Sequence, residues 1–137
     1  MAAKTLHDMF VEELQDIYDA EHQIAEALPQ MQEVAANREL TRAFKDHLEM
    51  TRLQINRLEQ IFESLGEKPK RKPCKGMKGL ISEGQELIKE VEDKQTLDAG
   101  LLAAAQKVEH YEISAYGTLR TWAREMNHSK EADLLQT

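Results

Sequence analysis

Apolar residues recur every three or four positions along most of the chain, which is the spacing of one face of an α-helix. The first stripe predicts a helix near residues 5–36, with Thr5 as its N-cap. After the short polar break "AANREL", a second stripe predicts a helix near residues 38–65, which Gly66 is well suited to end. A break this short makes the two helices antiparallel neighbours.

The second half of the chain continues the helical pattern after a basic connector at residues 66–79. Two prolines, two glycines and six Lys or Arg residues lie between residues 68 and 79. A short helix near residues 78–92 and a long one near 96–126 follow. Ser129 is a candidate N-cap for a last helix at 129–137, which we expect to be the start of a truncated fourth long helix. We therefore predict a single all-α domain, residues 1–137, folded as an antiparallel helical bundle.

Composition and charge exclude several classes of protein. The formal net charge of −7 argues against nucleic-acid binding. The chain has no run of 18 apolar residues, so we expect no membrane span, and its first residues lack the apolar core of a signal peptide. The single cysteine, Cys74, excludes an internal disulfide and suits a reducing compartment, so we expect the protein in the cytoplasm.

Three glutamates stand where apolar residues are expected. Glu21 occupies a core step of the first stripe, Glu112 lies inside the stripe of the helix near 96–126, and Glu109 lies at its edge. A buried carboxylate without a partner is very costly, so each needs a cation, a proton or a metal ion. Four-helix bundles hold pairs of metal ions through glutamates on facing helices, some of them three residues apart like Glu109 and Glu112. This pattern predicts a metal site at the bundle centre.

The helix near residues 38–65 offers three candidate ligands. Spacing favours Glu49, although Arg52 stands where a Glu-x-x-His motif would have histidine. The helical wheel favours His47, which borders the apolar stripe. Depth in the bundle favours Gln54, which lies at about the level of Glu21. We keep His47, Glu49 and Gln54 as candidates.

The inward glutamates also have an interpretation without metal. Arg52, Arg57 or Lys107 could neutralise them in a buried network of ion pairs. Tyr18 and Tyr116 are candidates to hydrogen-bond the carboxylates, although packing is the commoner role of such tyrosines. For Cys74, the basic surroundings could lower its pKa and make it reactive, but an ordinary packed or exposed thiol is the simpler expectation.

Three segments, "ELQDIYDAEHQIAEALPQM", "FKDHLEMTRLQINRLEQIFE" and "AAAQKVEHYEISAYGTL", resemble the YciF-like proteins of the ferritin-like superfamily. The resemblance covers almost the whole chain and implies a ferritin-like, rubrerythrin-related bundle that is dimeric and carries a dinuclear metal site. It maps metal-ligand positions onto Glu21, Glu109 and Glu112. The sequence departs from the wider superfamily at Arg52 and in its short last helix.

Two functions follow from these observations. The first is a bacterial stress-response protein that binds iron or manganese through bundle-centre glutamates and acts on oxygen or peroxide. The second is a non-catalytic helical homodimer that acts through interaction and carries a degenerate site neutralised by arginine. The sequence alone leaves both functions open, and with them whether the protein is an enzyme.

Overall fold

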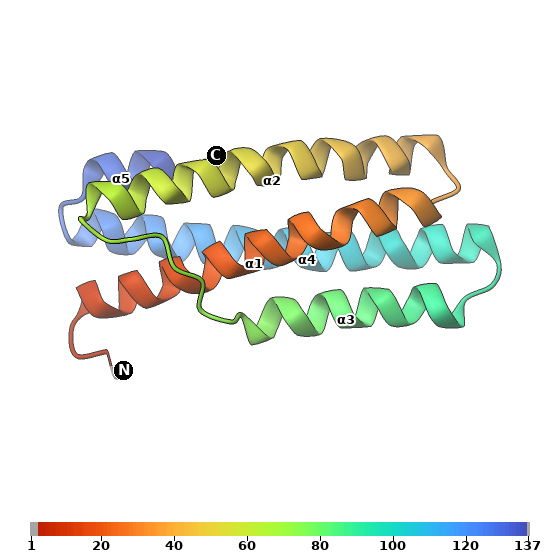
Figure 1. Ribbon diagram of the computed structural model, residues 1–137, viewed down its shortest axis with the longest axis horizontal. Coiled ribbons are helices and arrows are strands. Elements are labelled where there is room, and N and C mark those ends of the chain that lie inside the picture. The colour runs from red at the N-terminus through yellow and green to blue at the C-terminus, as the bar shows by residue number, and fades with distance from the viewer. Residues whose placement is uncertain (1–2, 137) are drawn as a thin grey trace.

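The computed structural model describes residues 3–136, and these residues form five α-helices and no β-strand. The helices are α1 (Leu6–Val34), α2 (Arg38–Ser64), α3 (Lys75–Glu90), α4 (Lys94–Glu125) and α5 (Ser129–Leu135) (Figure 1). The predicted all-α bundle is confirmed. In the part of the chain that the structure describes, no helix combines the length and the apolar character that crossing a membrane requires.

Helices α1 and α4 each pack against three others: α1 against α2, α3 and α4, and α4 against α1, α3 and α5. Consecutive long helices run in opposite directions, so α1 and α2 form one antiparallel pair and α3 and α4 another (Figure 1). The buried apolar side chains come from all five helices. The largest fully buried ones are Phe10, Leu14, Ile17, Phe44, Leu58, Ile61, Phe62, Met77, Leu101, Leu119 and Leu135. Burial of each stabilises the fold by about 1.5–3 kcal/mol before the loss of chain entropy is counted.

The ends of α2 and α4 share one stop geometry. Gly66 follows α2 with φ of 73°, and the N–H of Glu67 donates to the carbonyl of Phe62 at 2.9 Å. Asn127 follows α4 with φ of 60°, and the next N–H donates to the carbonyl of Ala123 at 2.8 Å. Both are Schellman motifs, which need a residue that tolerates the left-handed region. Glycine and asparagine are the residues that do so most readily.

Two helices begin earlier than the sequence pattern predicts. Helix α3 starts at Lys75 and not at residue 78, because Cys74 acts as its N-cap and its Sγ accepts the N–H of Met77 at 3.4 Å. Helix α4 starts at residue 94 and not at 96, because Asp93 accepts the N–H of Thr96 at 2.9 Å. Residues 75–79 of the predicted connector are therefore helical.

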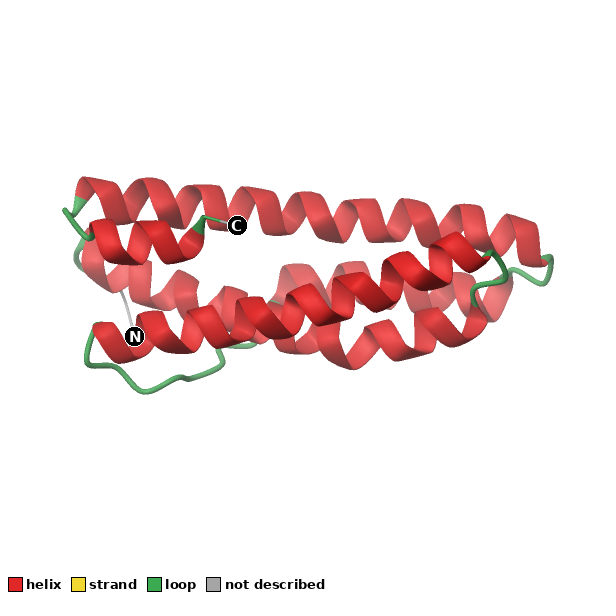
Figure 2. Ribbon diagram, turned by 90° about the horizontal axis from the view of Figure 1, so that it is seen from above, coloured by secondary structure: helices red, strands yellow, loops and turns green. Residues whose placement is uncertain are grey.

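Helix α5 differs from its prediction at its start. Ser129 is the first helical residue and not the N-cap, a position taken by His128 without a capping hydrogen bond from its side chain. Residue 137, where we predicted this helix to end, lies outside the described residues. Helix α5 packs against α4 and α2. It occupies only one end of the space between these two long helices, and the last described residues follow it there (Figure 2).

The connector between α2 and α3 is anchored on a buried carboxylate of α1. Asp19 accepts hydrogen bonds from the N–H of Cys74 at 2.7 Å, from Arg71 Nε at 2.8 Å and from Gln23 Nε2 at 2.7 Å. Burial raises the pKa of Asp19, but these three donors outweigh burial and hold the pKa below its usual value. Asp19 thereby fixes the point at which α3 begins.

We expect Asp19→Ala to lower the free energy of unfolding by about 2 kcal/mol, because it leaves the N–H of Cys74 and the guanidinium of Arg71 without their acceptor. The matched control is Glu26→Ala, which removes the other, exposed carboxylate that contacts Arg71. It should change the stability by less than about 0.5 kcal/mol. Urea unfolding measures both variants, and equal losses would contradict an anchoring role for Asp19.

Candidate metal centre

Three helices bring polar side chains to the centre of the bundle. Glu21 of α1 is fully buried, Glu112 of α4 is 6% exposed and Gln54 of α2 is 9% exposed. Each side chain occupies a core step of an otherwise apolar stripe, so the packing of the helices forces the three together. Depth in the bundle thus identified the partner on α2 better than motif spacing did, because Glu49 is exposed.

The Gln54 carboxamide lies between the two carboxylates. With its nitrogen toward them, Gln54 donates to Glu112 Oε2 at 3.2 Å and to Glu21 Oε2. Tyr116, also buried, donates its hydroxyl to Glu21 Oε2 at 3.1 Å. The other oxygen of the Glu21 carboxylate, Oε1, is buried and has no hydrogen-bond partner. A buried acceptor left without a partner costs about 1–3 kcal/mol, so this oxygen marks a place for a proton or a cation.

Electrostatics at the centre follow from burial and from the closeness of the two acids. Burial and the adjacent Glu112 raise the pKa of Glu21 well above its usual value. His47 Nε2 lies 3.0 Å from Glu112 Oε1, and this contact raises the pKa of His47 although burial opposes it. His47 is therefore the basic side chain that pairs with the acids at the centre, through Glu112.

The interpretation without metal requires arginine or lysine to neutralise the buried glutamates. Residues 3–136 contain no ion pair of this kind. Arg52 is exposed, and neither Arg57 nor Lys107 forms an ion pair with the buried carboxylates. Within the described residues, the only ion pair at Glu21 or Glu112 is the one with His47.

A cleft of about 310 Å³ opens beside the buried acids, between α2 and α4. His47, Gln54, Glu109 and Glu112 line it. Glu109 is exposed, so its predicted inward position is wrong, because a residue at the edge of a stripe faces solvent wherever no helix covers that edge. The structure thus brings together Glu21, Gln54, Glu112 and His47, with Glu109 on the solvent side.

A group of three His, Cys, Asp or Glu side chains that could hold a metal ion is absent from the described part of the chain. The Gln54 carboxamide hydrogen-bonds the carboxylates with its nitrogen inward, and a half-turn of the amide group would present its oxygen to them instead. A carboxamide oxygen is a ligand for hard divalent cations. The residues present therefore fit a cation held by two carboxylates and one carboxamide.

Other predicted neighbours of the site lie elsewhere. Tyr18 donates to Glu59 Oε2 at 2.8 Å, so it does not contact the carboxylates at the centre. Cys74 is buried, and burial raises the pKa of its thiol, so it is a packed thiol and not a reactive one.

Sequence reasoning missed a further buried carboxylate, Glu131 of α5. Ser64 Oγ donates to Glu131 Oε1 at 3.0 Å, and His128 Nδ1 lies 3.9 Å from Oε2. The signal that could have found it is position: Glu131 precedes the buried Leu135 by four residues, which places both on one face of α5. The protein itself satisfies this carboxylate, so it does not indicate a ligand.

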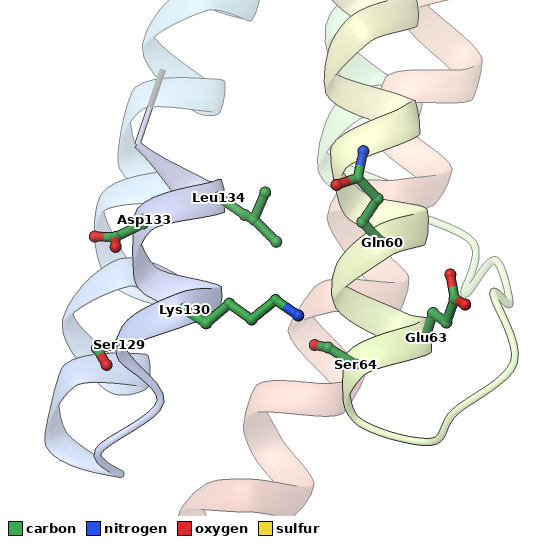
Figure 3. Close-up of a pocket in the computed structure, with 7 residues that line it drawn as sticks. All are labelled: Gln60, Glu63, Ser64, Ser129, Lys130, Asp133 and Leu134. Atoms are coloured by element: carbon green, nitrogen blue, oxygen red, sulfur yellow. The ribbon is translucent and has the colours of Figure 1, made fainter.

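A larger cleft of about 820 Å³ lies between the end of α2 and α5 (Figure 3). Gln60, Glu63 and Ser64 line one side, and Lys130 and Asp133 are on the other (Figure 3). All five are exposed and can be solvated by water. Because none is buried, this cleft lacks the feature that marks the bundle centre.

Comparison with known proteins gives a family and a fold. The DUF892 family, described as a domain of unknown function, matches residues 5–137. Protein YciF of Escherichia coli strain K12 is 46% identical over 99% of this chain and 82% of its own length. Its crystal structure, reported as that of a stress protein, has a TM-score of 0.93 over 98% of this chain and 85% of the other. YcfI of Rhodopseudomonas palustris is 48% identical, with a TM-score of 0.95 over 96% and 84% of the two chains.

We expect Glu21→Gln to raise the free energy of unfolding of chelator-treated protein at neutral pH by about 1 kcal/mol. The raised pKa of Glu21 means that the folded protein disfavours the charged carboxylate, and glutamine removes this cost while keeping the shape. The exposed Glu49→Gln is the matched control and should stay within about 0.5 kcal/mol of wild type. Thermal and urea unfolding measure both. A clear loss of stability in Glu21→Gln would show that the centre is fully satisfied without a ligand.

Proposed function

The chain belongs to the DUF892 family of domains of unknown function, and we propose that it is a stress-response protein that binds a divalent metal ion at the bundle centre. One observation carries the metal: a fully buried carboxylate, Glu21, has an oxygen without a partner and faces a second carboxylate and a carboxamide. The stress role is supported by the likeness to YciF, which is a stress protein.

The ligand chemistry favours iron or manganese. Glu21, Gln54 and Glu112 offer oxygen atoms, which suit hard divalent ions, and His47 adds an imidazole nitrogen, which suits iron. His47 and Glu109 line the cleft on the solvent side and provide ligands for a second ion, as a dinuclear site requires. When bound, such ions supply Lewis acidity and redox chemistry toward oxygen or peroxide.

The protein's own residues then have separate tasks. Tyr116 holds Glu21 through its hydroxyl, and His47 holds Glu112 through its Nε2. The cleft between α2 and α4 gives a small molecule access to Glu112. Holding ligands rigidly from behind is the usual role of such supporting hydrogen bonds.

A homodimer that acts through interaction is the second candidate function. Large apolar side chains are exposed on α2 and α4: Met50 and Ile113 line the cleft, and Leu53 and Leu102 lie elsewhere on these helices. Such side chains are commonly covered by a partner. We also propose the cytoplasm as the compartment, with support from the single free thiol at Cys74.

Elemental analysis of protein purified without chelator tests the metal. We expect at least one iron or manganese ion per wild-type chain, and a content reduced by about tenfold or more in Glu21→Gln and in Glu112→Gln. Glu49→Gln, which changes an exposed carboxylate of α2, should bind as much as wild type. If the wild type carries no metal and gains none on incubation with Fe²⁺ or Mn²⁺, the interaction function replaces the metal-binding one.

A further inference from the structure

Gln54 faces the two buried carboxylates with its carboxamide, which can present either an N–H donor or an oxygen acceptor. With the nitrogen inward, Gln54 donates to Glu21 and to Glu112 and ties them together. With the oxygen inward, three oxygens from α1, α2 and α4 converge, and the nitrogen faces only hydrogen-bond donors. The first orientation needs no ion, whereas the second is unfavourable unless a proton or a cation lies among the oxygens.

We propose that Gln54 is a rotating ligand: its amide nitrogen closes the empty centre by bridging Glu21 and Glu112, and its oxygen coordinates the divalent cation when one enters. The inference rests on the proposed function, because it assumes that a cation binds between the two carboxylates. It adds the residue that sets how tightly the cation is held and how the protein stays folded without it.

A carboxamide is the one end group of this size that serves both states. A glutamate at position 54 would be a stronger ligand, but in the empty centre it would add a third acid and no donor. A methionine would fill the same volume, but it could neither bridge the carboxylates nor offer an oxygen.

The test combines Gln54→Glu and Gln54→Met with two measurements, the Tm of chelator-treated protein and the Kd for Mn²⁺ from the paramagnetic resonance signal of the free ion. Both variants should lower the metal-free Tm by about 3 °C or more, because both lose the bridge. Gln54→Glu should tighten Mn²⁺ binding by about tenfold, and Gln54→Met should weaken it by about tenfold.

Gln60→Glu is the matched control, because Gln60 is an exposed glutamine of the same helix and the substitution adds the same charge. It should leave both the Tm and the Kd close to wild type. Circular dichroism of each variant checks that the helices are intact.

A second measurement follows the Gln54 side chain in the wild-type protein. The side-chain NH₂ signal of Gln54 in the ¹⁵N spectrum should move on addition of Zn²⁺, a diamagnetic ion, as the nitrogen leaves the carboxylates. One outcome would overturn the rotating ligand and leave the metal site in place. In that outcome Zn²⁺ binds to the wild type but not to Glu21→Gln, the Gln54 signal does not move, and Gln54→Met binds Mn²⁺ as tightly as the wild type. If the wild type binds neither ion, both proposals fail together.

Discussion

Two carboxylates buried side by side in one small core are the constraint on which the rest of this structure depends. Glu21 and Glu112 come from helices that pack directly on each other, and both side chains are buried. Three surrounding side chains contact the acids: His47 through an imidazole nitrogen, Tyr116 through its hydroxyl, and Gln54 through a carboxamide between them. One carboxylate oxygen is still left without a partner, and this remainder points to a ligand.

The other buried acids of the protein differ from Glu21 because their hydrogen-bond partners are supplied by the fold. Asp19 is satisfied by a guanidinium, an amide and a backbone N–H, and it serves to anchor the connector on α1. Glu131 accepts from Ser64 and lies near His128. In both cases the fold supplies the partners, so the acid has a structural role. At Glu21 the same fold leaves one carboxylate oxygen, Oε1, without a hydrogen-bond partner.

Much of this arrangement could be predicted from the sequence, because helical periodicity reports directly on which positions face a core. The stripes identified Glu21 and Glu112 as inward and kept Gln54 as a candidate by its depth in the bundle. Periodicity failed where a small rotation about the helix axis decides whether a side chain is buried. Glu109 is one turn from Glu112, yet it faces solvent. Periodicity also missed the true start of α3, because cysteine is an unusual N-cap. It did not identify Glu59 as the partner of Tyr18, because that contact depends on how α1 and α2 pack.

The measurement that tests the account most directly is the location of a bound ion in crystals soaked in Mn²⁺. Diffraction data collected at the manganese absorption edge should show an anomalous peak among the oxygens of Glu21, Gln54 and Glu112. A peak only at exposed carboxylates such as Glu49, or none at any position in a fully soaked crystal, would contradict a metal centre at the core of this bundle.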